Sequence, residues 1–321
     1  MSQDPPEPLA VYIHWPYCAR ICPYCDFNVV KARGGEEPLR LARAILDDLE
    51  GHARMTGRRR LGSLFFGGGT PSLMSPAFVA EITTTARRLW SVEEPLEVTL
   101  EANPADADRF AALAAAGVNR LSLGIQSLDE GALRFLGRDH DAAQASRAMA
   151  AASAAFPRVS IDLIYARPGQ TAAAWGAELA SAAALGAEHV SPYQLTVEPG
   201  TAFGRAAARG RLPALDEDVA LALYETTQAV LERAGFDAYE ISNHARGPAA
   251  RSRHNLSVWR GGDYLGVGPG AYGRLTIAGA RVATIAARRI ADYVEQVDAT
   301  GVGLASREPL SPAEAAEERL L

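Results

Sequence analysis

The sequence predicts an α/β fold of parallel strands joined by crossover helices. Short segments rich in apolar and β-branched residues alternate with longer, alanine-rich amphipathic segments. This alternation is typical of an open doubly wound sheet or of a complete or partial β/α barrel. A second observation agrees: the chemically unusual motifs lie at or just beyond the ends of the predicted strands, where parallel β/α folds build their sites.

Seven strands are expected, with helical segments between them of which four have a clear amphipathic pattern. The predicted strands are 9–15, 61–66, 96–102, 118–124, 159–165, 189–195 and 237–242. The amphipathic stretches that predict helices are 38–53, 75–90, 139–155 and 216–235. No short-period repeat and no low-complexity linker interrupts this order. A chain of 321 residues is long enough for one large domain with an appendage.

Each of the first six strands contains or precedes a group of unusual residues. In chain order these are the cysteine loop, GGGTPS (67–72), EANP (101–104), GIQS (124–127), Asp162 within the fifth strand, and QLTVEPGT after the sixth. Loops from successive parallel strands converge on one edge of the sheet. The sequence therefore predicts a single site assembled from the whole sheet.

The composition argues against several classes of protein. A net charge of −6 and a pI of about 5.6 give no electrostatic footprint for nucleic acid. We expect the short run Arg58-Arg59-Arg60 to be a solvated helix end. The first ten residues carry acids and prolines where a secretory signal would be basic and then apolar. No long uncharged apolar stretch follows, so the expected location is the cytoplasm.

The three cysteines of the chain, Cys18, Cys22 and Cys25, lie within eight positions. A closed zinc site would need a fourth ligand, for which His14 is available. Cysteines packed as small apolar side chains would not be expected to gather between prolines and tyrosines. The spacing C-x₃-C-x₂-C favours an iron–sulfur cluster, and three thiolates leave one iron of a cubane without a protein ligand. Zinc remains the alternative.

Two glycine-rich segments have other possible interpretations. GGGTPS lacks the Lys-Ser/Thr ending of a phosphate-binding loop. GVGPGA (266–271) is similar to a dinucleotide fingerprint, but Pro269 interrupts the expected helix start and no strand–helix unit with an acidic partner follows. Nicotinamide binding is therefore not expected.

The cysteine motif after the first strand resembles the signature of the radical SAM proteins, in which S-adenosylmethionine chelates the fourth iron of a 4Fe–4S cluster. The motifs VYIHWPYCARICPYCDF, FFGGGTPS, LEANP, LSLGIQS, IDLIYARPGQT and HNLSVW…YLGVGPGA resemble one branch of that family. This branch contains oxygen-independent coproporphyrinogen III dehydrogenases and haem chaperones. The resemblance implies a partial (β/α)6 barrel, open on one side, over residues 1–236, and a C-terminal extension over 237–321.

The resemblance also implies roles for individual residues. The cluster ligands would be Cys18, Cys22 and Cys25, and the S-adenosylmethionine contacts would be Tyr12, Tyr24, Gly68, Gly69, Thr70, Glu101, Gln126, Arg138, Asp162, Thr196 and Tyr272. Flat aromatic faces suit an adenine, glycines allow close backbone approach, and an arginine fork suits a carboxylate. Any one of these residues alone is more simply explained as a turn residue or a helix cap. Their common register with the cysteine loop supports the prediction.

Within the branch, Phe27 favours the haem chaperones, because the dehydrogenases have a further cysteine two positions after the third cluster ligand. The chaperones also carry an H-N-x-x-Y-W motif, which here reads His254 to Trp259 with Val258 in place of the tyrosine. The resemblance implies that His254 and Trp259 contact haem, with His244 as a second candidate imidazole. A simpler interpretation is that His254 and Asn255 tie a loop to the barrel.

The chaperone hypothesis implies specific partners. They are haem, apo-haemoprotein clients such as respiratory enzymes, and a second copy of the chain in a homodimer. Peripheral membrane association is expected through the clients. The alternative hypotheses are a coproporphyrinogen III dehydrogenase and a zinc-stabilised structural protein.

The last twelve residues begin like a helix. Ser311 is a predicted N-cap, Pro312 suits the first turn and Glu314 completes a capping box. Members of the branch continue into a small additional domain, so we expect residues 237–321 to contain the segment with the His254–Trp259 motif and the truncated start of that domain.

Overall fold

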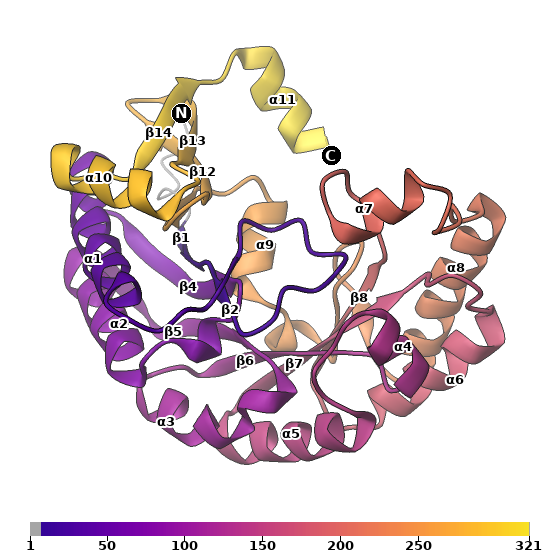
Figure 1. The fold of residues 1–321 in the computed structure, drawn as a ribbon. Coiled ribbons are helices and arrows are strands. Elements are labelled where there is room, and N and C mark those ends of the chain that lie inside the picture. Colours follow the sequence, from indigo (N-terminus) through magenta and orange to yellow (C-terminus); the bar gives the residue numbers. More distant parts are fainter. Residues whose placement is uncertain (1–7, 321) are drawn as a thin grey trace.

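The protein is described by a computed structural model that covers residues 8–320. Six parallel strands form a strongly curved sheet in the order β1-β4-β5-β6-β7-β8 (Figure 1). These strands are β1 (Leu9–Trp15), β4 (Arg60–Gly68), β5 (Ser91–Ala102), β6 (Arg120–Gln126), β7 (Arg158–Tyr165) and β8 (His189–Gln194). The six predicted parallel strands and the partial-barrel fold class are thus confirmed.

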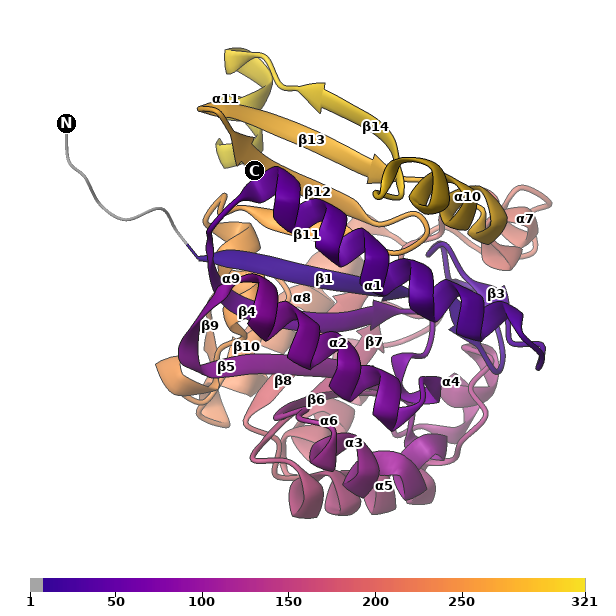
Figure 2. The same ribbon diagram turned by 90° about the vertical axis from the view of Figure 1, so that its left-hand side faces the viewer.

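Helices cover the convex face of this sheet (Figures 1 and 2). They are α1 (Glu37–Thr56), α2 (Pro76–Leu89), α3 (Phe110–Ala115), α5 (Ala142–Ala155), α6 (Ala172–Ala183) and α8 (Glu217–Arg233). The four predicted helices are confirmed, and two of them begin at a capping side chain. Asp141 caps α5 in a full capping box and Asp216 caps α8, so both helices begin one residue after these caps.

Residues after 236 extend the same sheet at both edges, which gives the order β14-β13-β12-β11-β1-β4-β5-β6-β7-β8-β10-β9. The added strands are β9 (Asp237–Ala238), β10 (His244–Ala245), β11 (Tyr264–Val267), β12 (Tyr272–Ile277), β13 (Ala280–Ala286) and β14 (Leu304–Pro309). The added helices are α9 (Arg253–Trp259), α10 (Ile290–Thr300) and α11 (Pro312–Leu320). β11 runs parallel to β1, and the other added strands pair antiparallel.

Three expectations for local structure can be compared with these elements. The predicted strand 237–242 is wrong in extent, because the Tyr239 N–H donates to the Asn243 carbonyl and the chain turns back. Arg59 is not a solvated helix end: its side chain is only 12% exposed and pairs with Asp263 at 2.9 Å. The capping box of α11 is confirmed, because the Ser311 N–H donates to Glu314 and the Glu314 N–H donates to the Ser311 hydroxyl.

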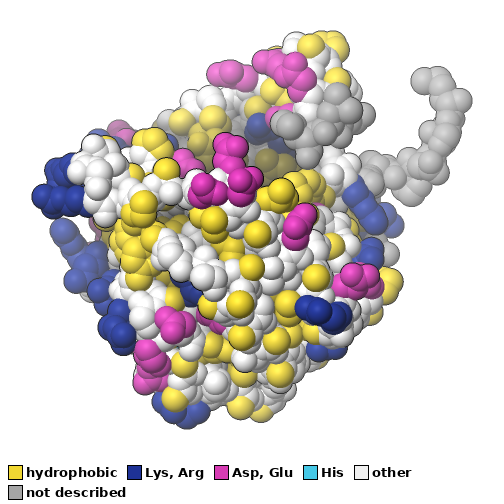
Figure 3. Space-filling model, turned by 90° about the vertical axis from the view of Figure 1, so that its right-hand side faces the viewer, with side chains coloured by type: hydrophobic (Ala, Val, Ile, Leu, Met, Phe, Trp, Pro, Cys, Tyr) yellow, Lys and Arg dark blue, Asp and Glu magenta, His cyan; other side chains and the backbone are white. Residues whose placement is uncertain are grey.

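The remaining short elements border the carboxyl ends of the parallel strands. They are β2 (Tyr17–Cys18), β3 (Val30–Lys31), α4 (Glu130–Phe135) and α7 (Ala202–Ala207). The main apolar core lies between the parallel strands and the outer helices, and a smaller core around Leu136, Ile164 and Phe203 lies beside the cysteine loop. On the face shown in Figure 3, acidic and basic side chains are interspersed. Within residues 8–320, no helix is both long enough and apolar enough to cross a bilayer.

Candidate functional site

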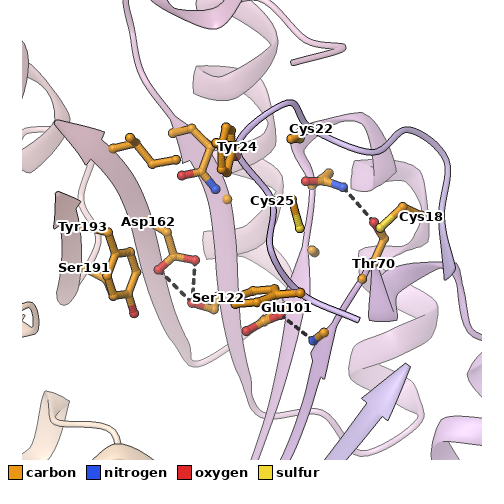
Figure 4. A pocket seen from close by; sticks show the side chains of 18 of the residues that line it. Cys18, Cys22, Tyr24, Cys25, Thr70, Glu101, Ser122, Asp162, Ser191 and Tyr193 are labelled. Atoms are coloured by element: carbon orange, nitrogen blue, oxygen red, sulfur yellow. Dashed lines mark hydrogen bonds between the residues drawn. The ribbon is translucent and has the colours of Figure 1, made fainter. Parts of the chain in front are cut away.

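A cavity of about 640 Å³ opens at the carboxyl ends of the parallel strands. The predicted site residues that line it are Cys18, Cys22, Tyr24, Cys25, Gly68, Gly69, Thr70, Glu101, Gln126, Arg138, Asp162 and Thr196. The cysteines lie on one side, and Asp162, Ser191 and Tyr193 lie on the opposite side (Figure 4). Residues from the ends of five parallel strands and from the cysteine loop after β1 therefore share one cavity, as the sequence predicts.

The cysteine loop is fastened to its surroundings by backbone hydrogen bonds. β2 pairs with β3 in parallel, so the two ends of the loop are held together. The Thr70 N–H donates to the Tyr17 carbonyl at 2.9 Å, and the Phe203 N–H donates to the Pro23 carbonyl at 2.9 Å. The loop is thus attached both to the turn after β4 and to α7.

The three thiols are free and face a partly buried environment. Burial raises the pKa of Cys18, and burial together with the neighbouring thiols raises the pKa of Cys25 to about 11. A guanidinium nitrogen of Arg138 donates to the Cys22 sulfur at 3.3 Å. Such thiols bind a metal by exchanging their protons for it.

The ligand set fits a cluster better than a single ion. A single zinc ion needs its ligands around one point, and between residues 8 and 320 no group of three or more His, Cys, Asp or Glu side chains is arranged to hold one ion. His14 does not complete a Cys₃His set, because its Nε2 faces the Asn28 carbonyl at 2.9 Å. A cubane instead takes each thiolate on a separate iron. A 4Fe–4S cluster held by Cys18, Cys22 and Cys25 would supply one iron with an open coordination position.

The turn after β4 requires its glycines. A Cβ at Gly68, whose φ is +111°, would lie 2.6 Å from the His14 ring, and a Cβ at Gly69 would lie 2.7 Å from the Tyr17 carbonyl oxygen. The Gly68 N–H donates to a carboxyl oxygen of Glu101 at 3.1 Å. The absence of side chains at these glycines therefore lets the backbone of the turn lie close to its neighbours and to a ligand in the cavity.

Two partly buried carboxyl groups face the cavity, Glu101 from β5 and Asp162 from β7. Burial, and secondly the nearby Asp162, raises the pKa of Glu101 to about 8, although the Gly68 N–H opposes this shift. Burial also raises the pKa of Asp162 to about 6, although the Ser122 hydroxyl donates to both of its oxygens at 3.2 and 3.1 Å. A cationic ligand would favour the ionised form of both groups.

Glu101→Gln is expected to stabilise the ligand-free protein more strongly as the pH rises. The unfolded chain releases this proton near the ordinary pKa of 4.5, but the folded chain keeps it until a pKa of about 8. The wild type therefore loses stability across that window, by more than about 1 kcal/mol, whereas glutamine has no charge to bury. Thermal unfolding of both proteins between about pH 5 and pH 9 measures the difference. A difference that does not change with pH would contradict the assignment, and the exposed Asp26→Asn is the control.

The remaining predicted residues do not line the cavity. Tyr12 is partly buried beside it, and its hydroxyl lies 3.2 Å from His14 Nδ1. Tyr272 is 51% exposed at the start of β12, and Trp259 is 45% exposed at the end of α9. His254 is buried near the first residue of α9. The structure therefore does not bring His254 and Trp259 together.

Helix α9 lies inside the curved sheet, near the amino ends of its strands (Figure 1). His254 Nδ1 lies 3.3 Å from the Ser63 hydroxyl, and its ring packs 4.9 Å from that of Phe65. The N–H groups of Arg253 and His254 both donate to Glu97, at 2.9 and 3.1 Å. Burial lowers the pKa of His254 to about 4. These contacts tie α9 to the barrel, in line with the simpler interpretation of His254, and they do not test a haem role. His244 is also buried, with its Nε2 facing Gln228.

The sequence reasoning missed several cavity residues. Asn103 donates to the Thr70 hydroxyl at 3.3 Å and accepts from Arg138. Ser122, Ser191 and Tyr193 line the cavity from the inner faces of β6 and β8. Side chains two apart share one face of a strand. Ser122 and Ser191 could have been predicted, because each belongs to a series of polar residues two positions apart along an otherwise apolar strand.

Known proteins match the chain over this fold and site. The Radical SAM superfamily matches residues 12–178. The bovine (Bos taurus) "Radical S-adenosyl methionine domain-containing protein 1, mitochondrial" is 44% identical over 318 residues, which are 97% of this chain and 72% of that protein. The "Heme chaperone HemW" of Escherichia coli is 39% identical over 279 residues, 86% of this chain and 72% of that protein. The chain spans 64% of the mouse (Mus musculus) relative of the same name as the bovine protein.

A solved structure shares the fold. "Coproporphyrinogen III oxidase (HemN) from Escherichia coli" superposes with a TM-score of 0.81 at 23% identity, covering 99% of this chain and 76% of that one. Taken together, the superfamily match, the curated relatives and the cysteine-lined cavity show that this chain belongs to the radical SAM superfamily, in the group that includes HemW.

Proposed function

We propose that the chain is a haem chaperone that binds a 4Fe–4S cluster, S-adenosylmethionine and haem, and delivers haem to apo-haemoproteins such as respiratory enzymes. The observation that carries this proposal is the 39% identity with HemW over 86% of the chain. Phe27 supports it, because this side chain lines the cavity at the position where the dehydrogenases carry a further cysteine.

The cavity supports the binding of S-adenosylmethionine. Its volume of about 640 Å³ falls within the range of small-molecule sites. Arg138 offers a guanidinium beside Cys22 for a carboxylate, and Asp162 and Glu101 offer carboxyls for hydroxyl or amino groups. In our proposal these residues orient the ligand against the open iron position. Tyr24 would pack on the adenosyl group, and Tyr12 would lie behind the residues that line this site.

For haem, His254 is the proposed axial ligand and Trp259 the proposed contact. The imidazole of His254 is neutral, as metal ligation requires. To reach a haem iron, however, α9 would have to release Ser63 and Glu97. Trp259 presents an exposed aromatic face without any such rearrangement.

The test is haem transfer under anaerobic conditions. Protein with a reconstituted cluster is loaded with haem and mixed with an apo-globin, and the Soret band reports transfer. We expect stable haem binding and complete transfer from the wild type, weaker binding by Trp259→Ala, and an altered Soret band in His254→Gln. Turnover of coproporphyrinogen III with release of 5′-deoxyadenosine would instead identify a dehydrogenase and overturn the chaperone assignment.

The setting of this activity is part of the proposal. We place it in the cytoplasm, with membrane association only through the client proteins, and with two copies of the chain in a homodimer. Sedimentation of the haem-loaded protein, alone and with client-containing membranes, tests both points. A monomer that binds protein-free vesicles would contradict them.

A further inference from the structure

The segment GVGPGA (266–271) lies against the cysteine loop and the first strand. A Cβ at Gly268 would lie 2.3 Å from the His14 carbonyl oxygen, and a Cβ at Gly270 would lie 2.7 Å from the Asn28 side-chain nitrogen. A Cβ at Gly266 would lie 2.1 Å from the Tyr272 carbonyl oxygen. Gly268 and Gly270 therefore permit close contact between chain segments that are far apart in the sequence, and Gly266 permits the close approach of β11 to β12.

Asn28 connects the cysteine loop to this segment. It follows the last cysteine by three positions, and its side-chain NH₂ group donates to two carbonyls, those of Pro269 and Arg288, each at 2.8 Å. These carbonyls belong to two different turns, between β11 and β12 and between β13 and α10. An amide nitrogen carries two hydrogens, so both donors of Asn28 are used.

The backbone of Asn28 is fixed from the other side. Its carbonyl accepts from His14 Nε2 at 2.9 Å, and His14 Nδ1 lies 3.2 Å from the Tyr12 hydroxyl. Because a carbonyl can only accept, the His14 proton lies on Nε2, and Nδ1 accepts from Tyr12. The loop is thus joined at one residue to β1 and to two turns of the C-terminal segment.

We propose that Asn28 is a positioning residue that holds the cysteine loop in its cluster-binding shape by fastening it to the turns at Pro269 and Arg288. Cluster retention then depends on residues more than 240 positions from the cysteines in the sequence. This inference rests on the cluster of the proposed function, but not on haem. It differs from a purely structural role, in which the same bonds would stabilise the cluster-free fold as much as the cluster-loaded protein.

Asn28→Ala tests the proposal through iron release. After anaerobic reconstitution, the rate of iron transfer to a coloured chelator is followed for both proteins. The variant is expected to lose iron roughly tenfold faster, because two hydrogen bonds that shape the loop are removed. The electron paramagnetic resonance spectrum of the reduced cluster with S-adenosylmethionine should also change. The denaturation midpoint of the cluster-free protein should stay close to that of the wild type.

Two glycine variants provide a matched pair. Gly270 and Gly279 have similar backbone conformations, with φ of +78° and +83°, but a Cβ at Gly279 meets nothing within 4 Å. Alanine at either position carries a similar backbone cost, and only Gly270→Ala displaces Asn28. We expect Gly270→Ala to speed iron release and Gly279→Ala to leave it unchanged. In the double variant with Asn28→Ala, Gly270→Ala should add little, because both act on one contact.

Each outcome of these experiments supports or contradicts the proposed role of Asn28. Equal iron release from wild type and Asn28→Ala overturns the proposal and leaves the chaperone function untouched. Faster release matched by an equal loss of cluster-free stability assigns Asn28 a purely structural role, and equal effects of the two glycine variants also contradict the proposal. A confirmed effect of Asn28 together with failed haem transfer would reject the chaperone function alone.

Discussion

Replacing Cys22 with alanine is expected to abolish the iron–sulfur chromophore after anaerobic reconstitution. With three thiolates in the chain, each one accounts for a third of the protein ligands of the cluster. Cys22 also accepts a hydrogen bond from Arg138, so its loss removes one partner of that guanidinium at the cavity wall. Iron and sulfide content and the visible absorption spectrum measure the result. Cys18→Ala and Cys25→Ala are expected to give the same loss.

The neighbouring Asp26→Asn serves as the matched control, because Asp26 is an exposed anionic residue of the same loop. It should retain the chromophore. Colourless wild-type protein containing one equivalent of zinc would refute the cluster and revive the zinc hypothesis. Variants that retain a full complement of iron would show that other residues bind the cluster.

Replacing Glu97 with alanine is expected to produce the largest loss of folding stability, about 3–5 kcal/mol. Glu97 is 3% exposed and accepts from Arg158 at 2.7 Å and from the first two N–H groups of α9. Arg120, also buried, is a further positive charge near it. Removing the carboxylate leaves buried positive charge and two backbone donors unsatisfied. Urea unfolding of the cluster-free protein measures the effect.

Glu188→Ala is the control for this prediction. Glu188 binds the same Arg158 at 2.8 Å, but its side chain is 33% exposed. Water can replace it, so we expect a loss of about 1 kcal/mol or less. If the two variants are equally destabilised, burial is not what makes Glu97 important.

The parallel strands could be predicted because each is a short, mostly apolar segment between turn residues. The early end of β9 could not, because the turn before Asn243 depends on a tertiary hairpin beside β8. The place of α9 inside the barrel was also beyond prediction. Its seven residues, RHNLSVW, form no long apolar stripe, and its position is set by Glu97, which lies 156 residues away from Arg253 in the sequence.

For the site, the cysteines and the glycine turn were predicted because they are contiguous motifs whose spacing has chemical meaning. Asn103 was missed because its partners, Thr70 and Arg138, meet only in the folded sheet. Asn28 was missed for the same reason, since both of its acceptors are backbone carbonyls, which no residue type reveals. Patterns thus predict ligands more readily than the groups that position them.

The placement of α9 has a consequence for how the protein can diversify. The helix and the charged residues around Glu97 lie near the amino ends of the strands. The residues that line the candidate site lie at the opposite, carboxyl ends. Contacts that stabilise the fold and residues that face a ligand are therefore separated along the strands. New specificity can evolve by exchanging side chains at the carboxyl ends without weakening the contacts around Glu97.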